Sequence, residues 1–338
     1  MPIIILTIFF FIICFFSLKY YIKIANEFKF TDIPNLLSNH KKSIPTGAGI
    51  VFLILISLIY FFLILGYNFL SLPIDFPNRH YLFLISILFL GIISFIDDIK
   101  SIHPIYRFSV HIVTVLISIP LFSYDVIYFL PEKLLFLIII FLWAYLINIF
   151  NFLDGSNGYL SINSIFIFVS FLITSYFDSS NLVNYDFKFI IIFFTTIILI
   201  VYLYFNFPKP KVFCGDSGSI VIGYIIGYIT FDLIFNNYWY IAISVLSYPI
   251  IEVSITIFNK VKEGKYPWER LFDYFFLKAL NRTNKNHNRI FLISFYYNLI
   301  NLTIILLMLF LNIKYICIFS VILAFLKIYI FSSIKFKN

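Results

Sequence analysis

Residues 134–158 read LLFLIIIFLWAYLINIFNFLDGSNG. The first part of this stretch is almost wholly apolar, and the second part holds asparagine, aspartate and glycine. A helix needs about 20 apolar residues to cross the hydrocarbon core of a bilayer. In hydrocarbon a helix also satisfies its own backbone polar groups, which an irregular chain cannot do. The stretch therefore predicts a membrane-spanning helix that runs directly into a polar loop.

The composition of the whole chain agrees with this segment. Of 338 residues, 62% are hydrophobic and only 12% are charged, whereas soluble domains carry about 25% charged residues. A soluble protein of this size could not bury so much apolar surface in one core. The composition thus excludes a soluble enzyme, and the net charge of +8 does not indicate a nucleic-acid partner. It predicts an all-α polytopic protein in a lipid bilayer.

Eleven segments are apolar enough to span a membrane, and ten remain an alternative because the split near Asn312 is weakly marked. We expect one integral-membrane domain over residues 1–338, with a basic substrate loop at about 259–288. The predicted spans are residues 3–22, 50–66, 80–96, 108–123, 134–150, 160–177, 188–206, 218–235, 237–257, 289–312 and 313–332.

Basic residues are distributed unequally between the two sets of loops. One set holds four of the 24 lysines and arginines, and the other set, with the C-terminal tail, holds twenty. Because cytoplasmic loops carry an excess of Lys and Arg, we expect the N-terminus outside and the C-terminus in the cytoplasm. We expect the protein in the inner (cytoplasmic) membrane, with its site facing the cytoplasm.

Glycine is scarce and concentrated. Six of the 11 glycines fall in three short stretches on the predicted cytoplasmic side, at residues 47–49, 155–158 and 215–218. Glycine permits positive φ angles and a close approach of the backbone to a ligand. Its concentration in these loops predicts that they form one shared site.

Paired acids end the third predicted span at Asp97 and Asp98. Adjacent carboxylates repel each other, which raises one pKa or recruits a cation. This pattern suits a general base or a magnesium ligand. The alternative is an acidic helix end that Lys100 neutralises.

The polar end of the opening stretch carries Asn148, Asn151 and Asp154 at spacings of three residues, followed by Gly155, Asn157 and Gly158. The first three side chains would share one face if the helix continued. An asparagine-rich helix end with glycine caps is the alternative interpretation. Three amides and an acid exceed what a cap needs, so the pattern favours a ligand site.

A third motif, Phe213-Cys-Gly-Asp-Ser-Gly-Ser219, opens the eighth predicted span. Asp216 or Ser217 could be a simple N-cap. The same arrangement also predicts an anion site, because glycine-flanked amides at a helix N-terminus bind phosphate and a carboxylate can hold a metal ion against it.

Read together, the motifs resemble the polyprenyl-phosphate N-acetylhexosamine-1-phosphate transferases, known as glycosyltransferase family 4. The similar blocks are residues 32–35 with 38–40 and 44–49, Asp97-Asp98 with Arg107, residues 148–158 and residues 213–219. The first loop departs from the family pattern at Leu37 and Ala48. His287 stands alone where the peptidoglycan branch has clustered histidines, which favours the branch that initiates O-antigen, teichoic-acid or similar glycans.

The resemblance implies transfer of N-acetylhexosamine-1-phosphate from a UDP-sugar to polyprenyl (undecaprenyl) phosphate, with release of UMP. It implies Mg²⁺ as cofactor, with Mn²⁺ as an alternative, and leaves a homodimer open. The implied catalytic residues are Asp97, Asp98 and Asp154, whose roles are exchangeable at this level. Asp216 and Asn151 are the implied metal ligands. The implied cofactor- and phosphate-binding residues are Asn148, Asn151, Asn157, Gly155, Arg107, His287 and Lys41.

Two other classes of membrane protein would show different sequence features. A membrane transporter would place acids near the middle of the bilayer and show repeated halves with broken helices. A magnesium-dependent membrane prenyltransferase would carry two motifs of spaced aspartates. In this chain the acids gather at the ends of spans and no repeat is visible.

Overall fold

The computed structural model describes residues 2–34, 39–40, 42–70, 74–75, 79–122, 131–178, 185–267 and 273–335. Within these ranges the chain is almost entirely helical, with two short pairs of strands. The helices are α1 (Pro2–Glu27), α2 (Gly49–Leu70), α3 (Tyr81–Ile99), α4 (Pro104–Ser118), α5 (Glu132–Leu153), α6 (Tyr159–Asp178), α7 (Phe187–Asn206), α8 (Asp216–Phe235), α9 (Trp239–Lys262), α10 (Phe275–Arg282), α11 (His287–Leu311) and α12 (Cys317–Ser333), with 3₁₀ turns at Ile119–Leu121 and Lys314–Ile316.

The prediction of an all-α membrane protein with eleven spans is confirmed. Eleven helices in the described ranges are long and apolar enough to cross a membrane. The weakly marked split is real, because Asn312 adopts a left-handed conformation (φ 53°) and ends α11. The remaining helix, α10, has eight residues and lies within the predicted loop at 259–288.

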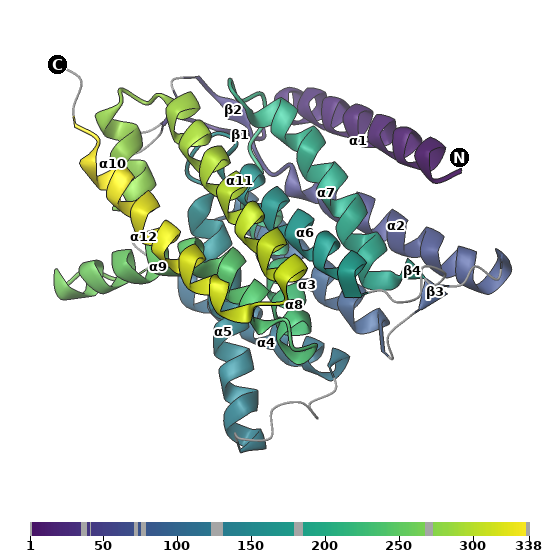
Figure 1. Cartoon of the computed structure of the whole chain (residues 1–338). Helices are drawn as coiled ribbons and strands as arrows, with labels where there is room; N and C mark the ends of the chain where they lie inside the picture. Colours follow the sequence, from purple (N-terminus) through teal and green to yellow (C-terminus); the bar gives the residue numbers. More distant parts are fainter. Residues whose placement is uncertain are drawn as a thin grey trace.

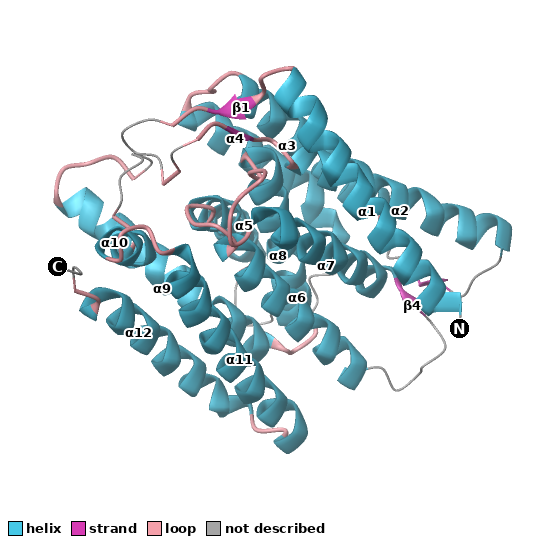
Figure 2. Cartoon of the chain, turned by 90° about the horizontal axis from the view of Figure 1, so that it is seen from above, coloured by secondary structure: helices cyan, strands magenta, loops and turns pink. Residues whose placement is uncertain are grey.

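Helix α8 is the centre of the bundle. Of its 18-residue membrane window, 89% is buried, against 17% for α1. Both views place α8 inside, with α1 and α2 along one side and α11 and α12 along the other (Figures 1 and 2). The first turn of α8 carries Asp216, so this acid lies on the most buried of the membrane helices.

Glycine lets α5 approach α8 closely. A Cβ atom on Gly227 would lie 2.1 Å from the Trp143 ring of α5, and one on Gly223 would lie 2.9 Å from the Ile147 backbone. Small residues commonly allow such close approach between membrane helices. The Gly223-x-x-x-Gly227 pattern therefore packs α8 against α5.

The outer helices carry large apolar side chains on their exposed faces. Phe9 of α1 and Phe62 of α2 are more than half exposed, as are Phe310 of α11 and Phe319 of α12. An exposed apolar shell of this kind would aggregate in water and is stable in hydrocarbon. The surface thus agrees with a lipid environment.

Two pairs of short strands lie in the loops, and the residues after β2 contact the segment before α8. Strand β1 (Thr31–Asp32) pairs antiparallel with β2 (Ile44–Pro45), and β3 (Ile74–Asp75) pairs in parallel with β4 (Tyr185–Asp186). Beyond β2 the backbone N–H of Gly49 donates to the Cys214 carbonyl at 2.9 Å. A Cβ on Gly49 would lie 2.0 Å from the Gly218 nitrogen. The first and last glycine motifs are therefore in direct backbone contact.

Candidate active site

Asp98, at the end of α3, binds the first turn of α8. Its Oδ1 accepts the backbone N–H of Asp216 at 2.7 Å. Its Oδ2 accepts the backbone N–H of Ser217 at 3.1 Å and the Ser217 hydroxyl at 2.7 Å. A carboxylate at a helix N-terminus satisfies free backbone donors and interacts favourably with the helix dipole. Asp98 therefore fixes α8, and with it Asp216, against α3.

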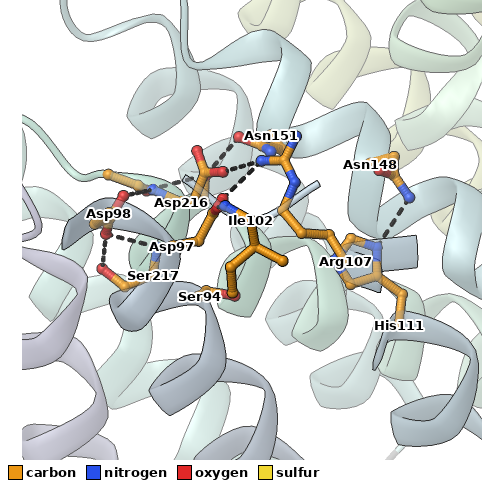
Figure 3. A network of polar contacts seen from close by, with 12 residues as sticks. Ser94, Asp97, Asp98, Ile102, Arg107, His111, Asn148, Asn151, Asp216 and Ser217 are labelled. Atoms are coloured by element: carbon orange, nitrogen blue, oxygen red, sulfur yellow. Dashed lines mark hydrogen bonds and ion pairs between the residues drawn. The ribbon is translucent and has the colours of Figure 1, made fainter. Parts of the chain in front are cut away.

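Arg107, in the second turn of α4, joins the two other carboxylates of this group. Its Nη1 donates to Asp97 Oδ2 at 2.8 Å and to Asp216 Oδ2 at 2.5 Å (Figure 3). Asp97 Oδ1 also accepts the backbone N–H of Ile102, in the turn between α3 and α4. Three helices thus direct charged side chains at one point, which is the end of the bundle that the sequence predicts as the site.

Gly215 makes room for this arrangement. It has φ +74°, and a Cβ at this position would lie 2.4 Å from the Asp98 carboxylate. An L-residue with a side chain would therefore be strained and would also displace Asp98.

The two asparagines of α5 bind at different depths. Asn151 Oδ1 accepts the Ser219 hydroxyl of α8 at 3.1 Å, one turn from Asp216. Asn148 Nδ2 lies 3.0 Å from Nδ1 of His111 on α4 and donates to the Ala144 carbonyl at 2.8 Å. Asn151 therefore lies at the carboxylate group, while Asn148 supports the packing of α5 on α4 beneath it.

Asp154 ends α5 and lies near the other acids. Its removal from water, followed by the negative charges of Asp216 and Asp98, raises its pKa to about 7. Such a carboxyl group can exchange a proton near neutral pH, as a general acid or base must do.

The loop after Asp154 is held by residues from distant parts of the chain. Asn39 of the first loop donates to the Gly155 carbonyl at 3.0 Å. Nδ1 of His287, at the start of α11, accepts the backbone N–H of Asn157 at 3.2 Å and lies 2.9 Å from the Ser156 hydroxyl. The Asn157 amide donates to the Pro208 carbonyl at 3.2 Å. His287 thus orders the loop that the sequence assigns to ligand binding.

The structure brings most of the predicted site residues to one end of the bundle. Asp97, Asp216 and Arg107 are in direct contact, and Asp98 binds the same helix turn. Lys41, predicted to bind phosphate, lies outside the described residues. In the part of the chain that the structure describes, no three Asp, Glu, His or Cys side chains form a ready-made metal site. The predicted metal-binding role of Asp216 and Asn151 stays a prediction.

Four residues that build this site were not among the predicted catalytic, metal or binding residues, although Ser217, Ser219 and Asn39 lie within the quoted motifs. Ser217 and Ser219 bind Asp98 and Asn151, while Asn39 and His111 bind Gly155 and Asn148. His111 lies one helical turn after Arg107, so the shared face of α4 is a signal that could have identified it. No local pattern connects Asn39 to a loop 116 residues away.

The central part of the chain is similar to one family of known proteins. Residues 80–234 match the sequence model described as Glycosyl transferase family 4. The chain is 28% identical over 251 residues to a phospho-N-acetylmuramoyl-pentapeptide-transferase of Fervidobacterium nodosum, covering 70% of this chain and 73% of that protein.

A shorter stretch is similar to a second relative. Over 89 residues the chain is 33% identical to the phospho-N-acetylmuramoyl-pentapeptide-transferase of Leuconostoc citreum, which covers 25% of this chain and 26% of that protein. The family match extends from the start of α3 to the end of α8, and so contains the contacts of Asp97, Asp98, Arg107 and Asp216. Over residues 80–234 the chain is therefore similar to glycosyl transferase family 4.

Proposed function

We propose that this protein transfers N-acetylhexosamine-1-phosphate from a UDP-sugar to a polyprenyl phosphate and releases UMP. The observation that carries the proposal is the joining of Asp97 and Asp216 by one guanidinium group, Arg107 Nη1. It brings two family motifs, 119 residues apart, to one end of a membrane bundle. The family match supports the same class of reaction.

The transfer exchanges one phosphoanhydride for another. An oxygen of the lipid phosphate attacks the phosphorus that bears the sugar. A new P–O–P bond forms while the bond to the UMP oxygen breaks. Both substrates are polyanions, so catalysis consists mainly of positioning them and stabilising charge.

The carboxylates divide this work in our proposal. Asp154, whose pKa is about 7, accepts a proton from the attacking lipid phosphate or positions this phosphate for attack. Asp97 orients Arg107 toward phosphate oxygens, and Asp98 holds Asp216 in place through the amides of α8. Asn157 and Gly155, in the loop ordered by His287, bind the nucleotide.

The donor chemistry of the site fits Mg²⁺. Carboxylate and amide oxygens are the ligands that this ion takes in proteins, and it is usually held by one or two carboxylates together with substrate phosphates and water. Asp216 and Asn151 would hold it. When bound, the ion would neutralise the diphosphate and stabilise the departing UMP.

The sugar and the pathway belong to the proposal as well. The solitary His287 favours a UDP-N-acetylhexosamine and a surface glycan of the O-antigen or teichoic-acid type. Both relatives carry a name that specifies an N-acetylmuramoyl-pentapeptide product, so this donor is the competing candidate.

The test is UMP release by the purified protein in detergent with undecaprenyl phosphate and Mg²⁺. Donors are UDP-N-acetylglucosamine, UDP-N-acetylgalactosamine and UDP-N-acetylmuramoyl-pentapeptide. We expect release with an N-acetylhexosamine donor, dependence on the lipid phosphate, and loss of release with EDTA. Turnover of the pentapeptide donor alone would overturn the choice of substrate.

Three variants test the site, namely Asp97→Asn, Asp154→Asn and Asp216→Asn. Each should lower the rate at least a hundredfold while the protein remains folded in detergent. Asp232→Asn is the matched control, because Asp232 pairs with Lys188 at the opposite end of α8 and should retain near-normal activity. Near-normal rates in two of the three site variants would overturn the assignment.

A further inference from the structure

A lysine is buried within the last membrane helix. Lys327, near the middle of α12, is 1% exposed. Ionisable groups inside membrane helices are costly, and they usually have a partner and a role. Lys327 lies outside the family match at residues 80–234, so nothing in that match accounts for it.

Aromatic rings surround the ammonium group of Lys327. The Nζ atom lies 3.5 Å from the centre of the Tyr248 ring and 4.4 Å from that of Tyr297, and Tyr159 and Phe331 lie within 6 Å. Cation–π attraction of this kind is strongest where water is excluded. The rings belong to four different helices, so the lysine joins α12 to α6, α9 and α11.

A buried acid accompanies the lysine. Glu252 of α9 is 0% exposed and lies one helical turn after Tyr248, the ring nearest the Lys327 ammonium group. Its Oε1 accepts the backbone N–H of Phe276 at 3.3 Å, while Oε2 has no hydrogen-bond partner. Lys260, in the last turns of α9, lies over the Tyr274 ring at 5.0 Å.

Phe276 connects this buried pair to the candidate active site. It is the second residue of α10, and its ring stacks on Tyr159 with centres 4.2 Å apart and planes 8° apart. Tyr159 directly follows the loop at 154–158, and its hydroxyl bonds that of Tyr248 beside Lys327. A Cβ on Gly155 would lie 3.0 Å from the Leu277 side chain and 3.4 Å from the Phe276 ring, so α10 packs closely on this loop.

The other end of α10 is attached to α12. Arg282 Nη1 donates to the Ser332 carbonyl at 2.8 Å and to the Ile334 carbonyl at 3.3 Å. Both ends of α10 therefore depend on elements that Lys327 holds together. Glu252 binds the start of α10, and α10 lies against the loop after Asp154.

We infer that Glu252 and Lys327 are positioning residues, which hold α10 against loop 154–158 and so shape the nucleotide side of the site. The kinetic part of this inference rests on the proposed function. The structural part, the attachment of α10, does not depend on it.

The experiment compares Lys327→Met, Glu252→Gln and the double variant with the wild-type protein in detergent. Lys327→Met leaves the Glu252 carboxylate buried without its compensating charge, which is strongly unfavourable. We expect tryptic cleavage after Lys278 and Arg282, followed by mass spectrometry, to become at least tenfold faster. The double variant removes both ionisable groups, so its rate of tryptic cleavage should be closer to that of the wild type than the rate of Lys327→Met is.

Kinetics distinguish positioning from general loss of stability. For Lys327→Met we expect the KM for the UDP-sugar to rise about tenfold, with the KM for polyprenyl phosphate within twofold of normal. Simple destabilisation would lower kcat and leave both KM values unchanged. If Lys327→Met cannot be purified, the same cleavage rates and KM values are compared between Glu252→Gln and the double variant.

Lys188→Met is the matched control, because it breaks the Lys188–Asp232 pair at the far end of the bundle and should not change cleavage of α10. Unchanged cleavage and KM in Lys327→Met, or effects that simply multiply in the double variant, would overturn the inference. If the wild type releases no UMP while the cleavage results hold, only the proposed function fails.

Discussion

Asp98 makes contacts in the structure that its sequence pattern did not predict. The sequence predicts a catalytic carboxylate, and the structure shows both of its oxygens engaged by the first turn of α8. The pattern of paired acids was visible, whereas the partner 118 residues away was not. Its predicted catalytic role stays a prediction, and its contacts define a positioning role.

Asp98→Asn should destabilise the protein, because an amide offers one acceptor oxygen to three donors. The expected loss is about 1–3 kcal/mol, the usual cost of leaving buried donors unsatisfied. The measurement is the melting temperature in detergent. Ser217→Ala removes only one of the three donors, so it should lower the melting temperature less than Asp98→Asn does. Equal melting of Asp98→Asn and wild type would contradict the capping role.

The raised pKa of Asp154 predicts that the stability of the protein depends on pH. Below pH 3.8, the ordinary pKa of an aspartate, the group is protonated in both the folded and the unfolded state. Between there and about 7 the folded state retains a proton that the unfolded state has lost. The contribution of Asp154 to stability therefore falls as pH rises through this window.

The variant Asp154→Asn removes this titration and isolates its effect. With EDTA present, the melting temperature of the variant minus that of the wild type should be larger at pH 8 than at pH 5. The difference cancels the titration of the other groups. A difference that is the same at both pH values would show that Asp154 has an ordinary pKa in the folded protein.

At the scale of elements, apolar length predicted the helices, because hydrocarbon allows few alternatives for the backbone. Their neighbours were harder to predict. The contact of Gly49 with Gly218 follows from backbone fit, which single-sequence patterns do not encode. The glycine count predicted that the loops share a site, and the structure provides the reason in this contact.

Two glycines with the same φ test the crowding around the carboxylates. Gly215 and Gly264 both have φ +74°, but a Cβ would meet Asp98 at Gly215 and nothing within 4 Å at Gly264. Gly264→Ala should cost about 1–2 kcal/mol from backbone strain alone. Gly215→Ala should cost more and also abolish UMP release. Similar melting temperatures for the two variants would show that the Asp98 contact is not tight.

For the whole molecule, the orientation in the membrane stays a prediction from the distribution of basic residues. Glu263→Cys and Lys314→Cys place thiols at exposed positions at opposite ends of the bundle, while the three native cysteines are buried. In intact cells a membrane-impermeant maleimide should label Lys314→Cys only. Glu263→Cys should react after permeabilisation. Labelling of Glu263→Cys alone in intact cells would reverse the orientation.

The branch of the resembled family was the hardest feature to predict from the sequence. It rested on one residue, His287, and the structure shows this side chain ordering the loop at Asn157 without showing what the loop binds. Both relatives are pentapeptide transferases by name, so they do not support the choice of branch. A recognition pocket depends on side chains from several loops, and a single position cannot define it.

The burial of Lys327 has a consequence for biosynthesis. The chain is made from its N-terminus, so α6, α9 and α11, which provide Asn163, Tyr248 and Tyr297 around the lysine, emerge from the ribosome before α12. The charged span thus enters a bilayer that already contains its partners. Chains that stop before α12 would leave Glu252 without its counter-charge, and we expect cellular quality control to degrade them.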